Sequence, residues 1–116
     1  PDAVHMELAK TGQLRFFEDT EGHSHVPAAD VLLSSVANAC GGASTGVVLT
    51  GIGDDGAKGA LEIHAAGGVV YAQTEDTCTV FGMPKAAVAI GAVDRLLAPK
   101  EIGKAIAARY AKRVAR

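Results

Sequence analysis

Two adjacent acids in a glycine-rich run are the residues of this sequence best suited to chemistry. The run reads Thr50-Gly51-Ile52-Gly53-Asp54-Asp55-Gly56. Aspartate is a favoured helix cap, and a carboxylate held at a turn can also orient a catalytic histidine and stabilise the imidazolium that forms during acyl transfer. Spacing alone leaves both roles open, and we expect one acid to cap a helix and the other to be the working group.

The same run argues against a phosphate site. Its glycines fit neither the GxGxxG nor the GxxxxGK[ST] spacing, and no lysine completes the second pattern. Two carboxylates at the start of a helix would also repel an anionic ligand. A nucleotide-binding module is therefore the least favoured interpretation.

The elements around the run predict where it lies. Residues 46–50 have the β-branched character of a buried strand, a helical stretch follows to Ala66, and residues 69–72 form a second short strand. A strand, a helix and a strand in this order form a βαβ unit and imply a parallel sheet. Sites in such sheets form outside the carboxyl ends of the strands, which is where the run falls.

The rest of the chain predicts further elements on both sides of this unit. They are a β-hairpin of residues 4–8 and 14–17, a helix over residues 28–40 with Pro27 in its first turn, a short helix from Met83-Pro84 to Gly91, an edge strand over residues 93–97 and an amphipathic helix from Pro99. Basic residues at the end of that last helix, Lys112, Arg113 and Arg116, suit the negative end of its dipole or a docking surface for an acidic partner.

Composition limits the classes of partner. The chain has 116 residues, a formal net charge of -2 and 48% hydrophobic residues, which is enough for one core but offers no general attraction for nucleic acid. No apolar run is long enough for a membrane span and no export signal opens the sequence, so we expect no membrane insertion and a cytoplasmic location. Cys40 and Cys78 lie in apolar stretches, and we expect buried reduced thiols there.

Four blocks follow one another along the chain in a recognisable order. They are His5-Met6-Glu7-Leu8, the stretch from His25 to Leu32, the run from Thr50 to Gly59, and Phe81-Gly82-Met83-Pro84 with the Ala-rich helix after it. Together they resemble the receptor-specific protein-glutamate methylesterases of bacterial chemotaxis, whose signature TGMGxDGAxG is similar to the run from Thr50 to Gly59. The resemblance implies a doubly wound α/β domain, Rossmann-like and three-layered, of which residues 1–116 would be the C-terminal portion.

The resemblance also implies roles for single residues. Asp55, the acid before glycine in the signature, would be the acid of a Ser-His-Asp triad, and Asp54 would occupy the variable position beside it. Ile52 would donate its backbone N–H to the oxyanion, where the family usually has Met, and a backbone donor survives that change of side chain. Gly51, Gly53 and Met83 would belong to the active-site loops.

The family's serine and histidine lie upstream of the block that opens this chain. In the family the serine stands in a GxSTGG-like turn, and we therefore expect the chain alone to have no significant esterase activity. The implied reaction is hydrolysis of glutamate methyl esters, and deamidation of glutamines, on chemotaxis receptors, without a cofactor or metal. The implied partners are those receptors, an N-terminal receiver domain or the missing part of the catalytic domain. The alternative is a non-enzymatic module that binds receptors or a regulator through the retained surface.

A serine and the four histidines could also take part in catalysis or metal binding, but their positions in the sequence favour structural roles. Ser44 lies in a run, Gly42-Ala43-Ser44-Thr45-Gly46, that looks like a nucleophile turn but follows a helix and leads into a strand, so we expect a loop role. His23 and His25 form a pair without an evident third metal ligand. We expect His25 to hold the loop before the helix, and His5 and His64 to be structural.

Overall fold

The chain begins with the hairpin that the alternating pattern predicts. The computed structural model describes residues 4–20, 22 and 28–114. Strands β1 (Val4–Leu8) and β2 (Leu14–Glu18) pair antiparallel, with His5 opposite Phe17 and Leu8 opposite Leu14. Gly12 makes the turn at φ 92°, a conformation that favours glycine. The prediction of a hairpin is confirmed.

A parallel sheet of three strands forms the centre of the fold. Strands β3 (Thr45–Val48), β4 (Val69–Gln73) and β5 (Arg95–Leu97) pair in the order β3-β4-β5, both pairs parallel. Helix α2 (Ala57–Ala65) connects β3 to β4 and completes the predicted βαβ unit. Strand β3 ends two residues earlier than expected, because Thr50 leaves the ladder and bonds to the side chain of Gln73, the last residue of β4, and to the carbonyl of Val80 beyond it.

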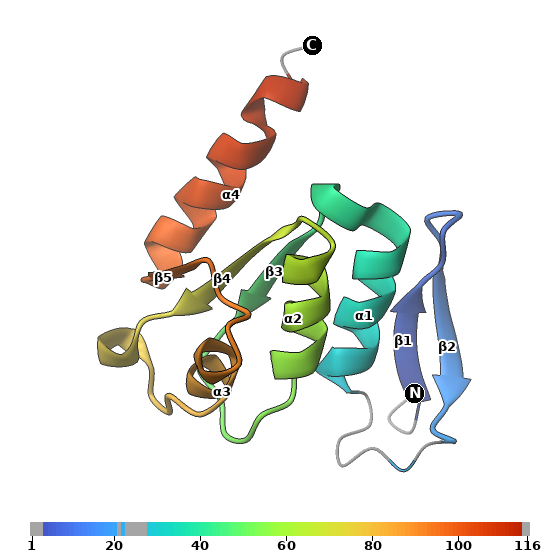
Figure 1. Cartoon of the computed structure of the whole chain (residues 1–116), viewed down its shortest axis with the longest axis horizontal. Coiled ribbons are helices and arrows are strands. Elements are labelled where there is room, and N and C mark those ends of the chain that lie inside the picture. The colour runs from blue at the N-terminus through green and yellow to red at the C-terminus, as the bar shows by residue number, and fades with distance from the viewer. Residues whose placement is uncertain (1–3, 21, 23–27, 115–116) are drawn as a thin grey trace.

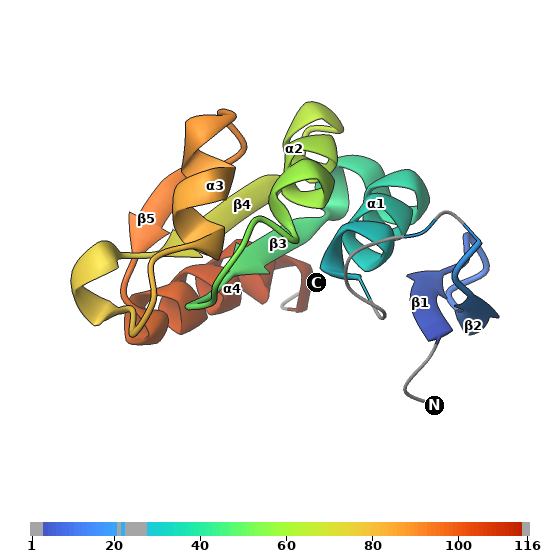
Figure 2. The same cartoon turned by 90° about the horizontal axis from the view of Figure 1, so that it is seen from below.

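Helices cover both faces of this sheet. Figure 2 shows α2 and α3 (Met83–Ala89) on one face and α4 (Pro99–Val114) on the other. Helix α1 (Ala29–Cys40) packs beside α2 and separates it from the hairpin (Figure 1). Short 3-10 turns follow α1 (Gly41–Ala43) and β4 (Glu75–Thr77). The doubly wound α/β architecture is therefore confirmed.

The core between these layers is built largely from small residues. Ala60, Ile63, Val70, Ala72 and Ala87 are fully buried. Small side chains let the elements approach closely, and the clearest case is Gly59, where a Cβ would lie 2.6 Å from the Cβ of Leu33 in α1. The first turns of α1 and α2 therefore lie side by side.

Helix α4 is attached to the start of β3 by polar contacts. Arg109 donates to the carbonyl of Gly42 at 2.8 Å and to the hydroxyl of Thr45 at 3.1 Å, and Tyr110 donates to the carbonyl of Ala43 at 2.7 Å. Ile102 is buried, as the amphipathic pattern predicts. The side chains of Lys112 and Arg113, and all of Arg116, lie outside the described residues, as does Pro27.

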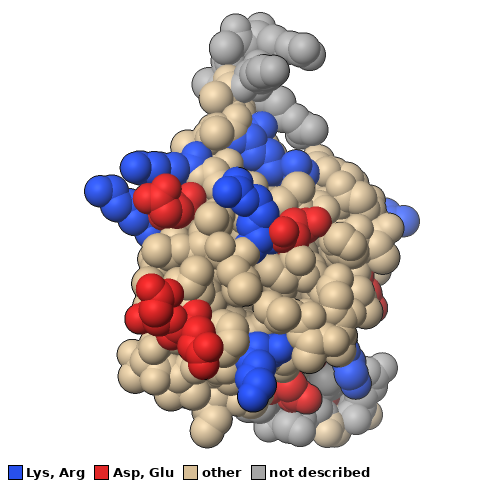
Figure 3. All heavy atoms as spheres, turned by 60° about the vertical axis from the view of Figure 1, so that its left-hand side comes forward, with Lys and Arg blue, Asp and Glu red and all other residues tan. Residues whose placement is uncertain are grey.

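The surface charges, the helix lengths and the cysteines can each be compared with what the sequence predicts. On the face shown in Figure 3, basic and acidic side chains are interspersed around an uncharged area rather than gathered into a basic surface. No helix in residues 28–114 is long and apolar enough to cross a membrane. The cysteines are free, but Cys40 is exposed at the end of α1 and Cys78 is half-buried, so the prediction that both are buried is wrong. Apolar neighbours in the sequence did not determine the direction of either side chain.

Candidate active site

The predicted site lies in the loop that joins the carboxyl end of β3 to the start of α2 (Figure 1). Gly53 and Gly56 have φ values of 91° and 99°, which let the chain reverse direction before the helix. A second loop, which follows β4 and precedes α3, lies against the first. The parallel bridge between Gly51 and Phe81 marks their contact. Two loops far apart in the sequence thus lie side by side at this end of the sheet.

Polar contacts hold the two loops together. The Thr50 hydroxyl donates to the carbonyl of Val80 at 3.1 Å and accepts the Val80 N–H at 2.9 Å. The buried Gln73 side chain accepts the Thr50 N–H at 2.8 Å and donates to the carbonyl of Thr77 at 2.8 Å. Gln73, at the end of β4, therefore fixes both loops at once.

The peptide between Gly51 and Ile52 is held on its carbonyl side. The Gly51 carbonyl accepts the N–H of Gly82 at 3.0 Å and the N–H of Met83 at 2.9 Å. The Ile52 N–H has no acceptor among the described residues, and the Ile52 residue is 80% exposed. The N–H that the resemblance assigns to the oxyanion is thus without a protein acceptor among the described residues, and the carbonyl of the same peptide accepts two hydrogen bonds.

Met83 lies beneath this loop. Its half-buried side chain packs against the core, and its sulfur would lie 2.5 Å from a Cβ placed on Gly51. Its terminal methyl would lie 3.9 Å from a Cβ placed on Gly56. Met83 supports the loop between these glycines, which explains why Gly51 carries no side chain.

Asp55 is anchored by the backbone of α1. Its two carboxylate oxygens accept the N–H groups of Ala29 at 2.8 Å and Asp30 at 3.1 Å. No lysine or arginine pairs with Asp55 among the described residues. Asp54 is exposed and uses its backbone carbonyl to accept the Ala57 N–H at 3.1 Å. The expected division between a capping acid and a separate working acid is therefore wrong: the acid that caps a helix is Asp55, which the resemblance assigns to the triad, and the helix is α1 and not the α2 that follows it.

Asp30 is the polar residue of this region that sequence analysis missed. One of its carboxylate oxygens accepts the N–H of Gly56 at 3.0 Å and the N–H of Gly59 at 2.8 Å. The residue preceding α2, Gly56, makes no side-chain cap of its own. An acid in the first turn of α1 was the available signal, but it did not show that the carboxylate reaches the neighbouring helix.

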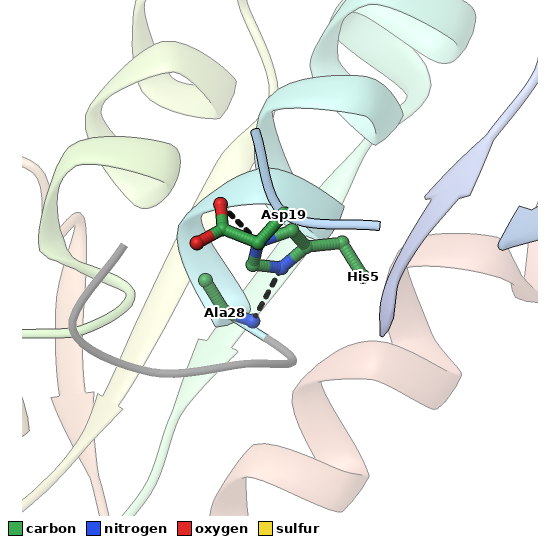
Figure 4. A network of polar contacts seen from close by, with 3 residues as sticks. All are labelled: His5, Asp19 and Ala28. Atoms are coloured by element: carbon green, nitrogen blue, oxygen red, sulfur yellow. Dashed lines mark hydrogen bonds and ion pairs between the residues drawn. The ribbon is translucent and has the colours of Figure 1, made fainter. Parts of the chain in front are cut away.

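The described histidines have structural contacts. His5 is fully buried; its Nδ1 accepts the Ala28 N–H at 3.0 Å and its Nε2 bonds to Asp19 at 3.0 Å, so the ring joins the hairpin to the start of α1 (Figure 4). His64 pairs with Asp94 across 3.2 Å near the surface. Both rings thus make the kind of structural contacts that the sequence predicts. His23 and His25 lie outside the described residues.

Ser44 has the loop role expected of it. It stands between the 3-10 turn and β3, is 2% exposed, and donates its hydroxyl to the carbonyl of Val36 at 3.3 Å. A nucleophilic serine needs an accessible hydroxyl beside a base. Neither condition is met at Ser44 in the described structure.

The cavity found among the described residues lies away from this loop. It has a volume of about 470 Å³ and opens between the hairpin, α1 and α2, lined by residues that include Glu7, Phe17, Asp30 and Lys58 but neither Asp55 nor Ile52. The cavity lining therefore includes neither of the two residues that the sequence predicts for the active site. Within residues 4–20, 22 and 28–114, no group of three or more His, Cys, Asp or Glu side chains could hold a metal ion.

A doubly wound α/β domain with an anchored carboxylate and a free backbone donor at the carboxyl edge of its sheet belongs to the class that can support acyl-transfer chemistry. Comparison with known proteins narrows the class. A family model described as CheB methylesterase matches residues 1–106. The chain therefore belongs to the CheB methylesterase family.

Named relatives and a solved structure agree with this family. The chain is 46% identical over 109 residues to protein-glutamate methylesterase/protein-glutamine glutaminase 1 of Photobacterium profundum, covering 91% of this chain and 31% of the relative. It is 49% identical over 100 residues to the protein-glutamate methylesterase/protein-glutamine glutaminase of Bdellovibrio bacteriovorus, covering 84% of this chain and 28% of the relative. The crystal structure of the Thermotoga maritima CheB methylesterase catalytic domain superimposes with a TM-score of 0.79 at 36% identity, covering 90% of this chain and 57% of that one.

Proposed function

We propose that this chain supplies the acid and one oxyanion donor of a protein-glutamate methylesterase active site. Asp55 is the acid of the Ser-His-Asp triad, and the Ile52 N–H stabilises the tetrahedral oxyanion. The reaction is hydrolysis of glutamate methyl esters on chemotaxis receptors, with release of methanol, and deamidation of receptor glutamines. The observation that carries the proposal is the Asp55 carboxylate held by two backbone amides beside the sheet's carboxyl edge.

The anchoring of Asp55 suits the role of orienting a histidine. A triad acid fixes the tautomer and direction of the imidazole, which requires that the carboxylate itself be immobile. The amides of Ala29 and Asp30 each occupy one acceptor position of Asp55. A carboxylate offers about four such positions, so capacity remains for an imidazole N–H.

The surroundings of Ile52 suit the role of an oxyanion donor. Such donors act best when they are fixed before the reaction, because no reorganisation is then needed as charge develops. The bonds from Gly82 and Met83 to the Gly51 carbonyl supply that rigidity. The side chain at position 52 projects into solvent, so isoleucine in place of the family's usual methionine alters only the rim of the site.

The serine and histidine come, in this proposal, from polypeptide upstream of the segment that matches the family here. Gly51, Gly53 and Met83 belong to the active-site loops in this proposal, and no cofactor takes part. Receptors, the upstream part of the catalytic domain and an N-terminal receiver domain are the proposed partners. The proposed compartment is the cytoplasm, which agrees with two free cysteines.

The test is methanol release from methylated receptor by this chain together with the upstream part of the catalytic domain, in trans or in one polypeptide. Asp55→Asn is expected to lower kcat by about 10³- to 10⁴-fold, because the amide cannot hold the imidazole in its reactive tautomer. The matched control is Asp54→Asn, one residue away and exposed, with kcat within about twofold of wild type. Ser44→Ala should also remain active.

The opposite pattern would overturn the proposal. If Asp55→Asn retained methanol release while Ser44→Ala abolished it, the acid and nucleophile would be assigned wrongly. If the combined polypeptides folded and bound receptor but released no methanol, the non-enzymatic binding module would be favoured instead.

A further inference from the structure

The start of α3 controls the direction of the Ile52 N–H. The Gly51 carbonyl and the Ile52 N–H belong to one peptide unit, and in a planar trans peptide they point in opposite directions. The N–H groups of Gly82 and Met83 bind the carbonyl at 3.0 and 2.9 Å. The Ile52 N–H is therefore directed away from α3 and is not free to rotate.

These two bonds also affect the strength of the donor. Hydrogen bonds accepted by a carbonyl polarise its peptide, so the N–H of the same unit becomes a stronger donor. Two bonds from backbone groups in a fixed turn do this without a mobile side chain. The contact thus both aims and strengthens the Ile52 N–H.

The absence of a side chain at position 82 makes the contact possible. Gly82 has φ -90° and ψ -62°, a conformation open to any residue, so its backbone does not require glycine. Glycine is required because neighbouring atoms leave no room for a side chain. A Cβ at this position would lie 2.6 Å from the Gly51 carbonyl oxygen and 3.1 Å from both the Ile52 Cα and the Gly53 nitrogen. All three atoms belong to the proposed oxyanion loop, so a methyl group at position 82 would displace that loop.

We infer that Gly82 is a positioning residue, whose missing side chain lets the start of α3 hold the Gly51–Ile52 peptide in the orientation that receives the oxyanion. The inference rests on the proposed function, because it assigns the Ile52 N–H to the transition state. A donor used only there affects kcat and leaves substrate binding nearly unchanged. A residue that merely stabilised the fold would not produce that split.

The experiment compares Gly82→Ala with Gly103→Ala in the complete catalytic domain, using methylated receptor as substrate. Gly103 lies in α4, and a Cβ placed on it would have no heavy atom within 4 Å apart from its own helix backbone, so the same chemical change there meets open space. Gly82→Ala is expected to lower kcat by about tenfold or more with KM within about twofold, and Gly103→Ala to leave both unchanged. The amide resonances of Ile52 and Gly53 should shift in the first variant only.

A second variant tests the contact between the start of α3 and the Gly51 carbonyl if the Gly82→Ala protein does not fold. Cys78 permits ligation of a synthetic segment covering residues 78–116, in which an ester replaces the amide between Gly82 and Met83. The ester deletes the Met83 N–H and adds no bulk. We expect kcat about three- to tenfold lower, since one neutral hydrogen bond to the Gly51 carbonyl is lost.

Wild-type kcat in a folded Gly82→Ala variant would overturn the inference, as would wild-type kcat in the ester analogue. Asp55→Asn, assayed in parallel, separates this failure from that of the proposed function. If Asp55→Asn is inactive while the Gly82→Ala variant and the ester analogue both keep wild-type kcat, only the inference fails. If Asp55→Asn is fully active, the proposed function fails as well.

Discussion

The carboxylate of Asp30, in α1, binds backbone N–H groups at the start of α2, and the carboxylate of Asp55, just before α2, binds backbone N–H groups at the start of α1. The Asp55 carboxylate accepts the backbone N–H of Asp30 at 3.1 Å, and the Asp30 carboxylate accepts the N–H of Gly56, the residue after Asp55, at 3.0 Å. Neither helix has a side-chain cap from the residue that precedes it. Negative charge at a helix start is favourable, so the exchange satisfies both helices and joins them. It also fixes the backbone that directly follows the proposed triad acid.

The first prediction concerns the stability that Asp30 confers. Asp30→Ala should lower the free energy of unfolding by about 1–3 kcal/mol, because the N–H groups of Gly56 and Gly59 lose their acceptor and Gly59 is buried. Urea denaturation with an unchanged m-value is the measurement. Asp54→Ala is the control: this exposed acid caps no helix with its side chain, and its removal should change stability by less than about 0.5 kcal/mol. Equal effects of the two substitutions would show that the exchange between α1 and α2 contributes nothing.

Local patterns were sufficient for the elements of this fold. Alternation between residues 4 and 17 predicts the hairpin, and the order of strand, glycine run and helix predicts the parallel sheet and the place of Asp55 on it. These features depend on neighbours within a few residues.

Contacts between distant elements were not predictable in the same way. Spacing indicated that one acid caps a helix, but Asp55 caps α1, whose first turn lies 26 residues earlier in the chain. That partner depends on how closely α1 packs against α2, which no local pattern contains. The exposure of Cys40 and the early end of β3 have the same origin, since both are decided by tertiary packing.

The second prediction concerns the buried histidine of the hairpin. His5→Leu keeps the volume nearly constant but removes the acceptor of the Ala28 N–H and a partner of Asp19, so stability should fall by about 2–4 kcal/mol. His64→Leu, at a site where the side chain is 42% exposed, should cost less than about 1 kcal/mol. Denaturant midpoints of both variants provide the comparison.

The same variants test whether His5 takes part in the chemistry. A folded His5→Leu protein, assayed below its new midpoint with the upstream part of the catalytic domain, should still release methanol from methylated receptor. Normal stability combined with complete loss of methanol release would instead identify His5 as a catalytic group.

The third prediction concerns the close packing of α1 on α2. At Gly59 a Cβ would lie 2.6 Å from the Leu33 Cβ and 2.9 Å from the Asp30 carbonyl oxygen, so Gly59→Ala must push α1 and α2 apart. We expect a loss of about 1–3 kcal/mol, typical of overpacking in a close-packed interior. Gly103→Ala makes the same change in open space within α4, where alanine favours the helix by about 0.5–1 kcal/mol. Opposite shifts in thermal midpoint are therefore expected, and a stabilised Gly59→Ala protein would contradict the close approach on which the Asp30–Asp55 exchange depends.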